Sequence, residues 1–129
     1  IIMVFTGVTL TGRAFTTARL YDDRMIASFR MVTDAVHRHG AKVAMPLARA
    51  GAGASVAVMG VTPVGPSSIP LPGGDVPRPL GREEIWRVAE AFVQAARQAA
   101  EAEFDAWIAV GKIHDPLLAE QALREGKAT

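Results

Sequence analysis

The chain has 129 residues, a length that fits one domain and allows about two thirds of the unfolded surface to be buried. Half of the residues are hydrophobic, which is ordinary for a globular protein and excludes a disordered one. The 14 basic and 13 acidic residues leave a net charge of +1, which gives no footprint for nucleic acid or an acidic membrane surface. The absence of cysteine excludes disulfides, thiolate metal sites and a cysteine nucleophile, and is compatible with the cytoplasm.

The beginning of the chain predicts a strand. Residues 1–5 form an apolar run rich in branched side chains, which is typical of a strand buried on both faces. This run is too short for a membrane span of ~20 residues, and it lacks the leader of a signal peptide. Because the first residue is not Met, we expect that the sequence lacks its own beginning. Residues 6–21 are polar and contain glycine, so they predict a loop.

A helix and a second strand are predicted next. Asp22 can cap a helix that ends at Gly40. The predicted buried face of this helix consists of Ile26, Phe29, Val32 and Val36. Residues 41–47 are a strand candidate that Pro46 closes. Two strands joined by a helix form a unit that requires a parallel sheet, so the predicted fold class is α/β.

The middle of the chain breaks this pattern. Residues 48–81 are rich in glycine, alanine and proline, and a loop this long is usually functional or disordered. Glu83 and Glu84 then begin a second helix, where acidic side chains suit the positive end of the helix dipole. The predicted inner face of this helix consists of Ile85, Val88, Phe92, Ala96 and Ala99.

The end of the chain predicts an anion site. Residues 104–110 form the third strand candidate, Gly111 and Lys112 form a turn, and Asp115-Pro116 opens a last helix over residues 118–126. A strand, a glycine turn and a helix N-terminus together place backbone N–H groups where they bind phosphate. The alternative interpretation is a plain turn with a solvated lysine. The element order is therefore β-α-β-loop-α-β-α.

The remaining polar and aromatic residues favour structural roles. His114 could act as an acid or base, but its position just past the turn favours a solvent-facing loop histidine. His37 and His39 are two residues apart and share no helical face, so we predict no metal site. Helix electrostatics, rather than paired-carboxylate catalysis, explains the acidic pairs. Trp86 and Trp107 are predicted to pack, with exposure of Trp107 at the junction as the alternative.

Four blocks of the chain resemble, in order, the NADH:flavin oxidoreductase (Old Yellow Enzyme) family. They are Ile1-Ile2 followed by Thr6-Gly7-Val8-Thr9 and Gly12-Arg13; Leu20-Tyr21-Asp22-Asp23 with Thr33 to His37 and His39 to Lys42; Pro63 to Ser67 with Pro77 to Leu80 and Glu83-Glu84-Ile85; and Ile108 to Gly126. The resemblance implies a partial (β/α)8 TIM barrel, FMN as cofactor and NAD(P)H as partner. It places residues 1–106 in the region of the second to fourth strands and residues 107–129 at the seventh strand and its helix, within one incomplete domain. Gly111 and Lys112 are the implied cofactor-binding residues.

The chain also departs from the family pattern. The His-x-x-His or His-x-x-Asn pair that follows the fourth strand in the family is absent, so we predict no catalytic residues. Where the family has Gln-Leu-x-His-x-Gly-Arg, this sequence has Pro46 for the Gln that bonds the flavin ring, Arg49 for the His and Ala52 for the Arg. Phe5 stands where the family has a small residue beside the flavin.

These observations predict an FMN oxidoreductase by descent that is inactive or impaired as this chain alone. The alternatives are a non-catalytic remnant that serves as an interaction module, and a weak binder of phosphate ligands. Three strands cannot close a barrel that needs eight strands and about 250 residues. Self-association is one way to cover the open sheet edges.

Overall fold

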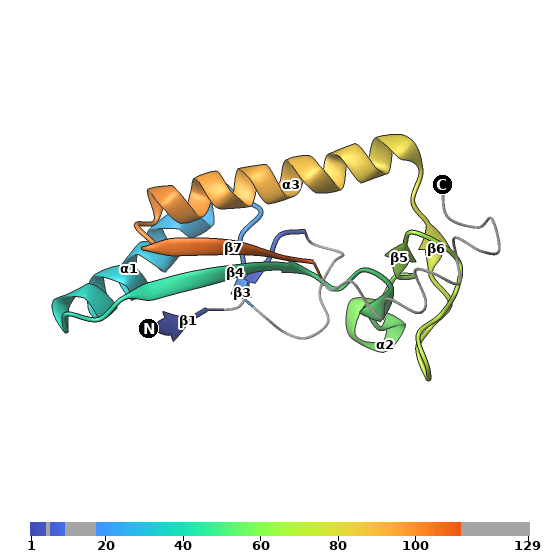
Figure 1. Cartoon of the computed structure of the whole chain (residues 1–129), viewed down its shortest axis with the longest axis horizontal. Helices are drawn as coiled ribbons and strands as arrows, with labels where there is room; N and C mark the ends of the chain where they lie inside the picture. The colour runs from blue at the N-terminus through green and yellow to red at the C-terminus, as the bar shows by residue number, and fades with distance from the viewer. Residues whose placement is uncertain (5, 10–17, 112–129) are drawn as a thin grey trace.

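The fold is an open parallel sheet with two helices on one face (Figure 1). The computed structural model describes residues 1–4, 6–9 and 18–111. Strand β4 (Val43–Arg49) is central, with β1 (Ile2–Met3) and β2 (Thr6–Gly7) along one side and β7 (Ala106–Gly111) along the other. Strand β3 (Ala18–Arg19) extends the sheet beyond β2. All of these pairs are parallel, which confirms the predicted fold class.

Both ends of the first helix and the start of the second long helix lie where the sequence predicts. The Asp22 carboxylate accepts a hydrogen bond of 2.9 Å from the backbone N of Arg24, and this caps the 3-10 turn η1 (Asp23–Met25) that leads into α1 (Ile26–Arg38). Gly40, at φ +69°, has the left-handed backbone that ends such a helix. Helix α3 (Arg82–Glu101) begins after Gly81. Among the described residues, no helix has both the length and the apolar composition needed to cross a membrane.

The core lies between the sheet and these helices. Its buried members are Val8, Leu20, Phe29, Val43, Met45, Leu47, Ala95, Ala99, Ala102 and Phe104. Side chains alternate along a strand, so Val43, Met45 and Leu47 place one face of β4 against α1 and α3. The intervening residues Ala44, Pro46 and Ala48 therefore belong to the opposite face of the sheet.

The predicted helix faces are partly wrong. In α1 the core uses Thr33 rather than Val32, which is 39% exposed. The Thr33 hydroxyl can be buried because it donates to the Ala102 carbonyl at 2.7 Å. In α3 the buried face runs through Ala95 and Ala99.

The first turns of α3 are exposed. Ile85 is 50% exposed and Trp86 is 70% exposed, so the prediction that both residues pack is wrong. Figure 1 shows the reason, because the amino-terminal turns of α3 extend past the ends of β4 and β7. No strand of the described sheet lies beneath these turns, and their apolar side chains remain at the surface.

The opening strand is shorter and more exposed than predicted. Ile2 is 47% exposed and Met3 is 60% exposed, rather than buried on both faces. Among the described residues β1 pairs only with β4, so its other side has no neighbour. Residues 6–21, predicted as loop, include the short strands β2 and β3.

Pro46 lies in the middle of β4 rather than closing it, and the strand continues to Arg49. Toward β1 and β2, the Ala44 carbonyl accepts from Val4 N at 3.0 Å and the Ala48 carbonyl accepts from Val8 N at 3.1 Å. Pro46 has no N–H to give to the ladder between them. The Thr6 hydroxyl donates to the Val4 carbonyl at 3.1 Å and supplies the missing donor. The interruption between β1 and β2 lies opposite Pro46.

The stretch 48–81 is not a plain loop. It contains the 3-10 turn η2 (Gly51–Gly53), the helical turn α2 (Val56–Met59), and β5 (Val64–Gly65) paired in parallel with β6 (Arg78–Pro79). Asp75 accepts from the backbone N of Val56 at 2.7 Å, which fixes the start of α2. These elements gather at the carboxyl end of β4 (Figure 1).

The third strand begins two residues later than predicted. Phe104 packs in the core against Phe29, and the left-handed Glu103 (φ 62°) forms the turn before it. Strand β7 runs without a break across residues 106 and 107. At this point the sequence resemblance changes from the family's fourth strand to its seventh strand. Lys112, His114 and the predicted last helix lie outside the described residues.

Candidate anion site at the carboxyl end of the sheet

A small cavity lies where the parallel strands end. Its volume is about 220 Å³, and the described residues that line it are Thr9, Arg49, Val64, Arg78, Leu80, Glu84, Arg87 and Val88. They come from the end of β2, from β4, from the β5–β6 pair and from the first turns of α3. In (β/α)8 barrels the carboxyl end of the strands is the face that carries function.

Arg49 is the most unusual residue of this cavity. It is the last residue of β4, and by alternation it shares the face of Met45 and Leu47, on the side of α3. Within the described part of the chain, its buried Nε has no hydrogen-bond partner and its guanidinium forms no ion pair. Burial lowers the pKa of Arg49 below its ordinary value, although the nearby Glu84 acts in the opposite direction.

The Glu84 carboxylate is already occupied. Arg78 donates to its two oxygens at 2.7 and 2.9 Å, and the backbone N of Gly81 donates at 2.8 Å. These bonds, that of Arg78 first, lower the pKa of Glu84 to about 2. Glu84 is therefore ionised at neutral pH, and its hydrogen-bonding capacity is directed to Arg78 rather than to Arg49.

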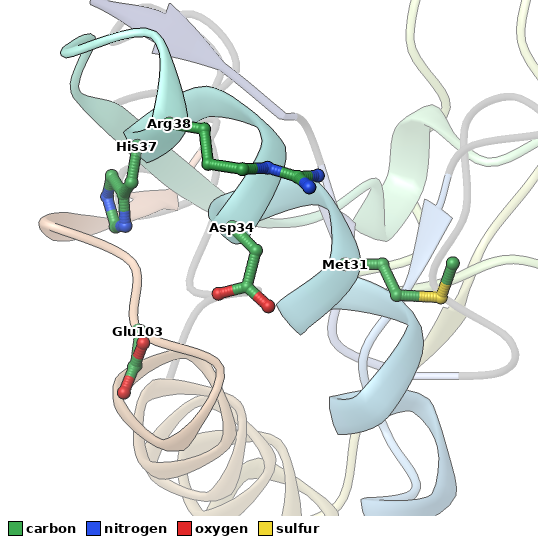
Figure 2. Close-up of a pocket in the computed structure, with 5 residues that line it drawn as sticks. All are labelled: Met31, Asp34, His37, Arg38 and Glu103. Atoms are coloured by element: carbon green, nitrogen blue, oxygen red, sulfur yellow. The ribbon is translucent and has the colours of Figure 1, made fainter.

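A second hollow, of about 610 Å³, lies at the opposite end of the sheet (Figure 2). Figure 2 shows Asp34 and His37 on the side of α1 that faces Glu103, while Met31 and Arg38 point away from it. His37 bonds to Asp105 at 2.7 Å, and Glu103 forms an ion pair with Arg30. Since this end of a barrel usually serves stability, we assign these residues a structural role.

Asp105 ties the amino ends of β4 and β7 together. Its carboxylate accepts from Lys42 Nζ at 2.8 Å, from the backbone N of Val43 at 2.9 Å and from His37 Nε2 at 2.7 Å. These bonds, that of Lys42 first, hold the pKa of Asp105 well below its ordinary 3.8. A carboxyl group with a lowered folded pKa stabilises the fold above the ordinary pKa and loses that effect as the pH falls.

We therefore expect the midpoint of thermal unfolding to drop as the pH falls below about 4. Asp105→Asn is expected to lower the midpoint at neutral pH and to flatten the acid slope, because the group that gains the proton is gone. Asp34→Asn is the control, since Asp34 has no ion pair or hydrogen bond among the described residues. Equal acid slopes in the wild type and Asp105→Asn would contradict this assignment.

The structure places only part of the predicted phosphate turn. Gly111 ends β7 at the same edge as the cavity and pairs with Arg49, while Lys112 and His114 lie outside the described residues. In the described part of the chain, no three acidic or histidine side chains come together as a metal site. In the sequence, Arg49 stood out only because it replaces the His of the family pattern. Its place in the cavity could have been inferred from its being a cation at the end of an apolar strand, where a parallel sheet carries its functional residues.

Parallel strands with helices on one face, and polar residues at the strands' carboxyl ends, define part of a (β/α)8 barrel. The sequence pattern of the NADH:flavin oxidoreductase / NADH oxidase family matches residues 1–114. The chain belongs to this family, which confirms the resemblance noted in the sequence.

Relatives of known name agree with this membership. The chain is 38% identical over 100 residues to a metal reductase of Desulforamulus reducens, covering 77% of this chain and 15% of that protein. It is 39% identical over 89 residues to an NADH oxidase of Thermoanaerobacter brockii, covering 67% and 14%. The solved structure of the Old Yellow Enzyme homologue from Zymomonas mobilis superposes with a TM-score of 0.74 at 28% identity, covering 81% and 34%. The chain thus spans only a minor part of each relative.

Proposed function

We propose that this chain forms part of an FMN-dependent NAD(P)H oxidoreductase barrel, with the region of the second to fourth strands in residues 1–106 and the seventh strand and its helix in residues 107–129. We further propose that this chain alone holds FMN weakly and does not turn over NAD(P)H. Family membership supports the first statement. The second rests on the side chains of β4, the strand that in the family donates to the flavin ring.

The residues of β4 do not fit a flavin ring. The only polar side chain in Val43–Arg49 is that of Arg49, which lies on the α3 side of the sheet. Pro46, at the position of the family's Gln, belongs to the other face and carries no hydrogen-bonding group. The absence of a side-chain donor on this face of β4 is the single observation that supports weak binding. A lost hydrogen bond to a buried polar edge costs about 1–3 kcal/mol.

The proposed phosphate contact is the turn at Gly111 and Lys112. The position of Gly111 supports it, because this residue ends β7 at the carboxyl edge and pairs with Arg49. Backbone N–H groups of such a turn favour an anion. Without the ring contact of β4, this turn alone gives the weak phosphate binding that is the alternative function.

A second candidate function is association through the open sheet. Among the described residues β7 pairs only with β4, and its Trp107 and Ile108 are 43% and 58% exposed. An unpaired edge with apolar side chains is a template for another strand. The missing sector of a barrel or a second copy of this chain would cover it.

NAD(P)H oxidation by the purified chain with added FMN tests the proposal. We expect the rate to equal that of free FMN at the same concentration, with NADH and with NADPH. A boiled sample of the chain is the control for non-specific effects. A rate that rises in proportion to the concentration of the folded chain would contradict the proposal.

A further inference from the structure

We propose that the cavity between β4 and α3 is a binding site for a small oxyanion, a carboxylate or a phosphate, held by Arg49 and Thr9. This site is separate from the proposed flavin face, because Arg49 lies on the helix side of the sheet and Pro46 on the other. The proposal therefore stands or falls independently of FMN binding.

Two polar groups in this cavity are buried without partners. The Nε of Arg49 and the Oγ1 of Thr9 are both inaccessible to solvent, and neither has a hydrogen-bond partner among the residues that the structure describes. Both residues line the same cavity, Arg49 from the end of β4 and Thr9 from the segment that follows β2. Buried polar groups are nearly always satisfied in folded proteins, so a neighbouring pair of orphans indicates an acceptor that binds between them.

The charge of the cavity favours an anion. Three guanidinium groups, of Arg49, Arg78 and Arg87, and one carboxylate, of Glu84, line it. The Glu84 carboxylate forms its ion pair with Arg78. Arg87 forms a long ion pair of 3.7 Å with the exposed Glu83. Arg49 forms no ion pair with any described residue, and a partly buried cation of this kind is costly unless a ligand supplies the negative charge. An arginine N–H and a hydroxyl are the donors that carboxylates and phosphates accept.

The size and the walls of the cavity limit the ligand. A volume of about 220 Å³ is below the range of roughly 300–1,000 Å³ that holds drug-sized ligands, so a whole flavin nucleotide is excluded. Val64, Leu80 and Val88 give the cavity an apolar wall. Inorganic phosphate and a short aliphatic carboxylate both meet these limits, and the apolar wall can contact the chain of the latter.

Thermal unfolding of the whole chain in titrations with inorganic phosphate and with butyrate tests the site, with chloride added to hold the ionic strength constant. We expect a saturable rise of the unfolding midpoint, because a ligand that binds only the folded state stabilises it. A response to phosphate alone assigns a phosphate site, and a stronger response to butyrate assigns a carboxylate site. A titration with chloride alone is the control. Equal shifts of the unfolding midpoint with phosphate, butyrate and chloride would overturn the proposal.

Arg49→Gln is the decisive variant. It is expected to weaken anion binding by about tenfold or more, while raising the midpoint of the ligand-free chain because an uncompensated buried cation is removed. Arg38→Gln is the matched control, since it removes an exposed arginine at the other end of the sheet and should leave the anion response unchanged. An anion response as strong in Arg49→Gln as in the wild type would overturn the proposal, whereas a weak residual response to phosphate is what the Gly111-Lys112 turn alone would give.

Thr9→Val provides a second test that leaves all charges in place, and it decides the question if Arg49→Gln fails to fold. Loss of one hydroxyl donor is expected to weaken anion binding several-fold. An unchanged response in this variant would show that the orphaned hydroxyl is not part of a site. Binding that is weakened in Thr9→Val but kept in Arg38→Gln would support the assignment.

Discussion

Phe104→Ala is expected to lower the free energy of unfolding by about 3–5 kcal/mol, the largest effect we predict for any single substitution in this chain. Phe104 is 5% exposed and lies edge-on to Phe29, with ring centroids 6.0 Å apart. The pair joins α1 to the segment that connects α3 with β7, so it bridges both helices and the sheet. Domains of this size are stable by only about 5–15 kcal/mol, so this loss brings the chain close to unfolding.

Urea unfolding followed by far-ultraviolet circular dichroism measures this loss. Val93→Ala is the matched control, because Val93 is an apolar residue of α3 that is 66% exposed, and its truncation should change stability by less than about 0.5 kcal/mol. If Phe104→Ala were as mild as Val93→Ala, the aromatic pair would not be the centre of the core.

Pro46→Gln is expected to bind FMN about 5- to 100-fold more tightly than Pro46→Val. Both substitutions restore the backbone N–H that β4 lacks opposite Val4, and so both repair the ladder in the same way. Only Gln also adds a side-chain amide on the face opposite the helices. The ratio of the two affinities therefore isolates the ring contact from the repair of the strand.

Fluorescence titration of FMN gives the two affinities, with the wild type as a third sample. The wild type should bind no more tightly than Pro46→Val, since neither has a donor on that face. Equal affinities of the Gln and Val variants would show that position 46 does not contact the flavin, and the family role inferred for it would be wrong here.

The sequence was sufficient to predict the parallel sheet, both ends of the first helix and the start of the second. Asp22, Gly40 and Glu84 act through local backbone geometry and hydrogen bonds, which can be read from residue type and spacing. The helix faces were less predictable. Thr33 is buried because the Ala102 carbonyl, 69 positions away, accepts its hydroxyl proton. No local pattern contains that contact.

Pro46 shows a second limit of sequence reasoning. Proline normally marks the end of a strand or an edge position, and on that basis it was expected to close β4. The strand continues because the missing donor is replaced by the Thr6 hydroxyl of the neighbouring strand. Trp86 was misplaced for another reason, because whether an apolar helix face is covered depends on how far the sheet extends beneath it.

The candidate anion site could be predicted only in part. Arg49 was visible as a cation at the end of an apolar strand. That its Nε has no hydrogen-bond partner among the described residues, and that Thr9 lines the same cavity, depend on contacts between distant parts of the chain. Arg78 and Glu84 come together because β6 ends just before α3, an arrangement hidden in a stretch that sequence reasoning treated as loop.

The amount of flavin that stays with the purified chain tests the central claim most directly. The chain is saturated with FMN, passed through a gel-filtration column and denatured, and the released flavin is compared with the protein concentration. The elution volume also reports association through the open sheet. We predict far less than one flavin per chain, because β4 offers no side-chain donor on the face opposite the helices. One flavin per chain, retained through the column, would contradict this account.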